Sequence, residues 1–195
     1  MDDRKDRIVI RFDEDTGRYR GAQPRESTVV APATTVSPTR LSPRARRMQA
    51  DANSMRKAFA RFPVIQLLLA QGVPPDLYRV QYNVLGLARG ANGQPIQRSQ
   101  HVVDIQLTAE YPRQAPKCKI LTPIFHPNFD PTVICVGDHW TAGESLVDLV
   151  VRVGEMIAYQ AYNIKSPLDG EAAMWTDLNR NRLPIDSRTL MPPER

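Results

Sequence analysis

Apolar side chains recur at helical intervals among basic and polar residues in the stretch 44–62. The repeating side chains are Met48, Met55, Phe59 and Phe62. The pattern predicts an amphipathic helix, and Pro63 should end it because the residue before a proline disfavours helical backbone.

Strand patterns follow this helix. Residues 64–69 come after a proline, begin with β-branched side chains and stop at a Gln-Gly pair, which favours a strand over more helix. Residues 78–84 and 103–107 alternate apolar and polar side chains, and the turn at residues 90–93 should join them as a hairpin. Residues 117–121 would add a fourth strand to an antiparallel meander.

The C-terminal part of the chain returns to helical patterns. Residues 145–159 are too apolar all round for a surface helix, so this helix should run through the core. A terminal helix is expected from Asp169 to about Arg182. Closely placed prolines oppose any further helix, so residues 185–195 should form an extended tail. The predicted fold class is α+β.

The N-terminal part differs in composition from the rest. Residues 1–23 hold a possible short hairpin, which would be marginal in isolation. Residues 24–43 contain four prolines among small and polar side chains, which indicates a flexible linker. The folded domain should therefore occupy residues 44–184, and a chain of this length can bury one core of roughly 150 residues.

The net charge of +5 is concentrated at the N-terminus. Residues 1–48 hold 11 Lys and Arg against 7 Asp and Glu, and the remainder holds 15 against 14. A nearly neutral body argues against a broad phosphate-binding face, so a dedicated nucleic-acid protein is not expected. Apolar runs stop short of the roughly 20 residues that a membrane helix needs, which predicts a soluble protein.

Two cysteines are present, Cys118 and Cys135. With no secretory leader pattern before them, a disulfide framework is poorly supported, and a reducing, cytoplasmic compartment is expected. Cys118 alternates toward the core of its predicted strand, which indicates a structural role. Cys135 follows His126-Pro127-Asn128, a rigid turn that carries imidazole and amide groups, and is the candidate nucleophile.

From about residue 44 to residue 184 the chain resembles the ubiquitin-conjugating enzymes, and its details look like the divergent bacterial branch of that family. The resemblance is carried by several ordered landmarks, which are together far more specific than His-Pro-Asn alone. These landmarks are Tyr111-Pro112, Ala115-Pro116-Lys117, His126-Pro127-Asn128, Ile134-Cys135, Trp140, Asn163 and Pro167-Leu168.

The resemblance implies the fold of that family (the UBC fold) and a carrier role. Cys135 would accept a ubiquitin-like protein from an activating enzyme as a thioester and pass it to an amine on a protein acceptor. Asn128 would orient the active-site loop and stabilise the developing oxyanion, and His126 would brace the loop. Asn163 and Ser166 would approach from the loop between the last two helices. No cofactor or metal is implied, and the general base stays unassigned.

Some positions depart from the family pattern. The interval from Asn128 to Cys135 is one residue shorter than usual, and Pro131 should stiffen it. Ser166 stands where many members carry an acidic residue that gates the acceptor lysine, so lysine transfer is less secure than thioester formation. Asp138 and His139 are hypothetical substitutes for missing active-site groups.

Two further departures concern partners. Arg113 stands where members that recruit RING ligases often expose an apolar side chain, and residues 141–144 lack the family's Ser-Pro-Ala contact loop. Ordinary RING-ligase recruitment is therefore doubtful. In bacteria such proteins can accompany dedicated modifiers and proteases in defence islands, so antiviral conjugation is the family-level expectation.

Two alternatives stay open. The first is a noncatalytic adaptor of the same fold that binds a modifier without accepting it. The second is metal binding or cysteine-protease chemistry by Cys118, His126, Cys135 and His139, whose spacing lacks the paired ligands of zinc sites. A protease would also need a histidine beside the sulfur, a geometry that sequence does not establish.

Overall fold

The structure is a computed structural model that describes residues 11–13, 18–20, 41–136 and 140–193. The chain divides into two compact units, Met1–Thr39 and Arg40–Arg195. In the first unit, β1 (Arg11–Asp13) pairs antiparallel with β2 (Arg18–Arg20). Nearly all of the predicted linker at 24–43 lies outside the described residues, and Pro43 already begins the first helix.

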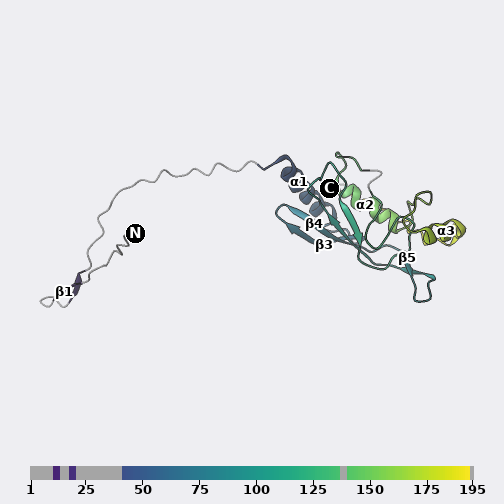
Figure 1. The fold of residues 1–195 in the computed structure, drawn as a ribbon, viewed down its shortest axis with the longest axis horizontal. Coiled ribbons are helices and arrows are strands. Elements are labelled where there is room, and N and C mark those ends of the chain that lie inside the picture. Colours follow the sequence, from purple (N-terminus) through teal and green to yellow (C-terminus); the bar gives the residue numbers. More distant parts are fainter. Residues whose placement is uncertain (1–10, 14–17, 21–40, 137–139, 194–195) are drawn as a thin grey trace, which may run out of the picture. The chain divides into compact units, whose positions relative to one another are not determined.

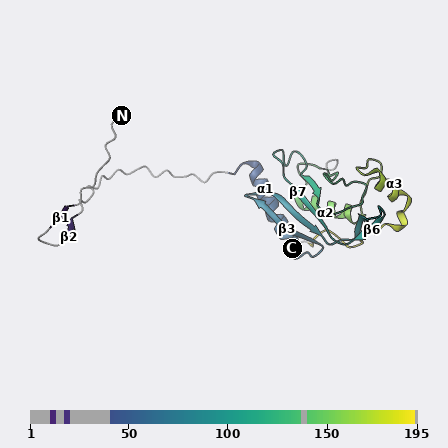
Figure 2. The same cartoon turned by 60° about the horizontal axis from the view of Figure 1, so that its bottom comes forward.

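The second unit combines an antiparallel sheet with three α-helices. The four-stranded sheet has the order β3-β4-β7-β8, and β5 and β6 form a separate two-stranded sheet. In both views of the ribbon, α1 lies at one end of this unit, and α3 lies at the other end beside the β5–β6 pair (Figures 1 and 2). The elements are α1 (Pro43–Phe59), β3 (Ile65–Gly72), β4 (Pro75–Tyr82), β5 (Gly86–Arg89), β6 (Pro95–Arg98), β7 (His101–Gln106), β8 (Lys117–Ile120), α2 (Leu146–Ile157) and α3 (Gly170–Leu178).

The core lies between the sheet and helices α1 and α2. Alternate side chains of β4 and β7 are fully buried, as their period-two pattern predicted. The hydroxyl of Tyr82 donates to the carbonyl of Val150 at 3.0 Å, which ties the sheet to α2. Gly154 allows this approach, because a Cβ there would stand only 3.1 Å from the Tyr82 ring. Most of α2 is buried, as its apolar sequence predicted.

These findings confirm the predicted α+β class and the meander, with two differences in detail. Helix α1 ends at Phe59 instead of Phe62, because the chain must turn before Pro63 to enter β3. The turn at residues 90–93 joins β5 to β6 and does not join β4 directly to β7. The chain leaves the main sheet after β4, forms this extra pair and returns as β7.

The terminal helix is shorter than predicted. It ends at Leu178, and a 3-10 turn, Arg180–Arg182, follows. Residues 183–193 form neither helix nor strand, yet they pack against the domain. Leu190 is buried in the core, and the carboxylate of Asp186 accepts a hydrogen bond from the main-chain nitrogen of Leu85 at 3.0 Å.

Candidate functional site

Cys135 is positioned by main-chain hydrogen bonds in the loop between β8 and α2. Its nitrogen donates to the carbonyl of Asn128 at 3.1 Å, and the nitrogen of Ile134 donates to the carbonyl of Cys118 at 3.0 Å. The intervening residues 130–133 close a tight turn, in which the nitrogens of Asp130 and Val133 each donate to the other's carbonyl. The short interval seen in the sequence is therefore a compact turn that presents the half-buried cysteine beside Asn128.

The side chain of Asn128 holds the loop between α2 and α3. Its Nδ2 donates to the main-chain oxygen of Asn163 at 2.8 Å, and its Oδ1 accepts from the main-chain nitrogen of Asn163 at 2.7 Å. Asn128 is only 3% exposed, so water competes little for these groups. We call this reciprocal pair the Asn128 clamp.

His126 lies beneath the clamp as a neutral, structural ring. Its Nδ1 accepts a hydrogen bond from the Asn128 nitrogen at 3.1 Å, so the proton belongs on Nε2. That Nε2 is buried and faces the Met156 main chain without a hydrogen bond of good geometry. Burial lowers the pKa of His126 to about 3, and the ring packs against Phe129 and Tyr159. His126 therefore braces the turn and offers no acid or base at neutral pH.

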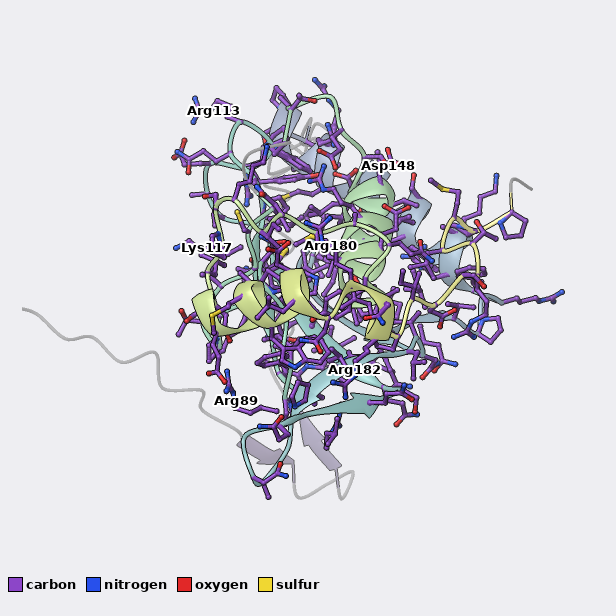
Figure 3. All side chains as sticks on the ribbon, turned by 90° about the vertical axis from the view of Figure 1, so that its right-hand side faces the viewer. Arg89, Arg113, Lys117, Asp148, Arg180 and Arg182 are labelled. Carbon is purple, nitrogen blue, oxygen red and sulfur yellow. The ribbon has the colours of Figure 1, made fainter. Side chains whose placement is uncertain are left out.

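The far end of the same loop is anchored as well. The carbonyl of Pro127 accepts from the nitrogens of Leu168, at 2.7 Å, and Asp169, at 3.0 Å. Arg89 on β5 forms ion pairs with Asp169 and Glu171 at the start of α3, and Figure 3 shows Arg89 near the bottom of the view and Arg113 near its top. The loop is thus fixed in its middle, by the clamp, and at the end that leads into α3.

A cavity of about 260 Å³ opens between Cys135, the clamp and the last turns of α2. It combines the sulfur and amide groups with a cation, a carboxylate and an aromatic ring. The lining residues are Asn128, Cys135, Arg152, Glu155, Met156, Ala161, Tyr162 and Asn163. The lining therefore offers charged and hydrogen-bonding groups beside the cysteine.

Arg152 is held rigidly at the edge of this cavity. Its guanidinium pairs with the carboxylate of Glu144 at 2.9 Å and donates to the carbonyl of Val136, the residue after Cys135, at 3.3 Å. The loop that carries Glu144 is fixed in turn by Arg47 of α1, which donates to the carbonyls of Ala142 and Glu144. A chain of contacts therefore connects α1 to the residue beside the cysteine.

Comparisons with known proteins identify the family of this chain. The family model for ubiquitin-conjugating enzymes matches residues 75–186, more than half of the chain. The chain belongs to the ubiquitin-conjugating enzyme family. Ubiquitin conjugating enzyme E2 B of Dictyostelium discoideum is 28% identical over 97 residues, which span 48% of this chain and 64% of that protein. Ubiquitin-conjugating enzyme E2 N of Macaca fascicularis is 29% identical over 117 residues, which span 55% of this chain and 75% of that protein.

A solved structure has a fold similar to that of this chain. The crystal structure of a proposed ubiquitin conjugating enzyme from Plasmodium yoelii superposes with a TM-score of 0.53 at 18% identity. The match covers 72% of this chain and 88% of that one. At this identity the likeness concerns the fold alone, which is the UBC-type arrangement expected from the sequence.

The residues predicted for the site are distributed unevenly around the cavity. Cys135, Asn128 and Asn163 line it together, and His126 supports it from below. Ser166 is exposed and does not belong to the lining. Asp138 and His139 lie outside the described residues.

Sequence reasoning missed the charged wall formed by Arg152 and Glu155. They are three residues apart on α2, and so share one face of a helix that was interpreted as apolar all round. Charged residues at this spacing in an otherwise apolar helix were the available signal.

Cys118, in contrast to Cys135, does not line this cavity. It is fully buried on β8, and burial raises the pKa of its thiol to about 12. Among the residues that the structure describes, no group of three or more His, Cys, Asp or Glu side chains is arranged to hold a metal ion. The same residues include no helix long and apolar enough to span a membrane.

Proposed function

We propose that this chain accepts the C-terminus of a ubiquitin-like protein as a thioester on Cys135 and transfers it to an amine. The observation that carries the proposal is the half-buried Cys135 at the edge of a cavity whose opposite wall is fixed by the Asn128 clamp. A glycine-rich tail suits a cavity of about 260 Å³, because its residues carry no side chains that need room.

The reaction needs two acyl transfers at the same sulfur. In the first, the Cys135 thiolate attacks the thioester carbon held by an activating enzyme, and the thiolate of that enzyme leaves. In the second, a neutral amine attacks the new thioester carbon, a C–N bond forms, the C–S bond breaks and the amine releases a proton. Asn128 serves these steps mainly by holding the loop, because its Nδ2 and Oδ1 already bond to Asn163.

The proposed partners are an activating enzyme, a ubiquitin-like modifier and a protein acceptor. Recruitment of an ordinary RING ligase is not part of the proposal, because Arg113 is 78% exposed and pairs with Glu110 where an apolar contact is needed. A role in bacterial antiviral conjugation stays a prediction from the resemblance. It is tested by asking whether a chain with Cys135→Ala loses protection against phage in its native host.

The direct test is a charging assay. The protein is incubated with ATP, an activating enzyme and the ubiquitin-like modifier encoded beside its gene, and nonreducing gels compare wild type with Cys135→Ala and Cys118→Ala. We expect an adduct in wild type and Cys118→Ala that strong reductant removes, and none in Cys135→Ala.

The absence of an adduct, with an activating enzyme shown to be charged, would refute the carrier function. In that case, retained binding of the modifier would identify a noncatalytic adaptor. An adduct that persists in Cys135→Ala would place the acceptor group elsewhere and would equally refute the assignment of Cys135.

A further inference from the structure

The cavity beside Cys135 contains a carboxylate whose charge the described protein does not balance. Glu155 lies on the last turns of α2, is half-buried and lines the cavity. Among the described residues, its carboxylate forms no hydrogen bond or ion pair. Arg152, three residues earlier on α2 and also in the lining, is already paired with Glu144 at 2.9 Å.

The main chain holds Glu155 firmly in this place. Its carbonyl accepts hydrogen bonds from the nitrogens of Gln160, at 2.9 Å, and Ala161, at 3.2 Å, where the chain leaves α2. Ala161 and the next two residues form the opposite part of the lining. The main chain of Glu155 is therefore tied to the start of the loop that carries the clamp.

Ser166, the residue expected at the acidic position of the family, is exposed and outside the lining. A serine hydroxyl can hydrogen-bond an amine but carries no charge to attract a lysine ammonium. Glu155 supplies a negative charge within the cavity itself.

We propose that Glu155 is the acceptor-positioning residue, which binds the ammonium group of an incoming lysine beside the Cys135 thioester. This inference rests on the proposed function. The carboxylate holds the ammonium, a proton passes to water, and the free amine attacks the thioester carbon. The C–N bond forms as the C–S bond breaks, Cys135 leaves as thiolate, and the second amine proton is released to solvent.

If Glu155 acts through its charge, it should speed transfer to a cationic nucleophile and not to a neutral one. A merely structural residue would affect both nucleophiles alike. Lysine arrives as a cation, whereas hydroxylamine is mostly neutral at neutral pH. Removing the carboxylate should raise the lysine concentration needed for half-maximal transfer and leave transfer to hydroxylamine unchanged. Added salt should slow lysine transfer in wild type more than in a variant without the charge.

The experiment needs no unidentified partner. A synthetic peptide ending in Gly-Gly as a mercaptoethanesulfonate thioester is exchanged onto the full-length protein, and mass spectrometry confirms the acyl group on Cys135. Its discharge is then timed with free lysine and with hydroxylamine. Wild type is compared with Glu155→Gln and with the matched control Glu110→Gln, which removes an exposed carboxylate outside the cavity.

We expect Glu155→Gln to slow lysine discharge about three- to fivefold, as for the loss of a partly exposed ion pair, with hydroxylamine discharge within twofold of wild type. Glu110→Gln should match wild type with both nucleophiles. Equal lysine rates in Glu155→Gln and wild type, or equal slowing of both nucleophiles, would overturn the inference while the proposed function stands. If wild type takes no acyl group at Cys135, the carrier function fails first, and the inference fails with it.

Discussion

The Asn128 clamp makes a sharp prediction for the exchange of one atom, Asn128→Asp. The variant keeps the Oδ1 acceptor for the nitrogen of Asn163 but replaces the donor Nδ2, which lies 2.8 Å from the Asn163 carbonyl, with an oxygen. Two acceptors then face each other at a position that is 3% exposed. The lost hydrogen bond and the poorly solvated charge together should cost about 2–4 kcal/mol of unfolding free energy.

Chemical denaturation monitored by tryptophan fluorescence measures this loss, and thermal unfolding should show a midpoint lower by roughly 5–12 °C. Asn163→Asp is the matched control. It makes the same exchange on the exposed partner, whose main chain forms the clamp and whose Oδ1 only accepts from the Lys165 nitrogen. We expect this control to stay within about 0.5 kcal/mol of wild type.

The pH dependence separates the clamp from a general packing defect. Burial and the facing carbonyl favour the protonated form of the new carboxyl group, so its pKa in the folded state is raised above that in the unfolded state. The stability that protonation gives is present at low pH and is lost as pH rises through the folded-state pKa. The gap between Asn128→Asp and wild type should therefore narrow as pH falls. Equal losses in the two variants, or a gap that does not change with pH, would refute the clamp.

Three other predictions rest on burial and on hydrogen bonds elsewhere in the domain. Burial lowers the pKa of His126 to about 3 and of His101 to about 4, so both rings stay neutral in the folded state at pH values where they are protonated in the unfolded state. The stability that this gives is fully present above pH 6.5 and is lost progressively as pH falls below it. Denaturant unfolding between pH 6.5 and 5 should show the free energy of unfolding fall by up to about 1.4 kcal/mol per pH unit for each histidine. His101→Gln should remove the part of this loss that is due to His101. With a thiol pKa of about 12, Cys118 should resist iodoacetamide in the folded protein, so that mass spectrometry finds rapid labelling at Cys135 alone. Arg47→Met should increase amide hydrogen exchange in residues 141–145 and lower stability by about 1–3 kcal/mol, because two main-chain carbonyls lose their donor; unchanged exchange would contradict this role.

The main sheet could be predicted from sequence because burial alternates with every second residue. Tyr78, Val80 and Tyr82 on β4, and Val103 and Ile105 on β7, are all buried on the face toward the helices. Pattern alone does not give strand order, so the turn at residues 90–93 was assigned to the wrong pair of strands. The four residues of β5 and of β6 are too short to show a period of their own.

From the sequence, residues of the site could be brought together only where they lie close to one another along the chain. His126, Asn128 and Cys135 lie within ten residues, and their spacing predicted a cysteine beside a rigid turn. The partner of Asn128 is the main chain of Asn163, 35 residues away, and main-chain groups leave no mark in a sequence. Arg152 and Glu155 were visible as charged residues in an otherwise apolar helix, but only the tertiary packing of α2 shows that they line the same cavity as Cys135.

The turn Phe125–Phe129 is the common reference for both walls of the cavity. The carbonyl of Asn128 fixes the nitrogen of Cys135, the side chain of Asn128 fixes Asn163, and the carbonyl of Pro127 fixes the start of α3. The carbonyl of Phe125 accepts from the Tyr159 hydroxyl at 2.6 Å, where the loop begins. Movement of this turn would therefore shift the nucleophile and the opposite wall together. The positions of the nucleophile and of the clamped loop therefore both depend on one turn, and the neutral, buried ring of His126 supports that turn from within the core.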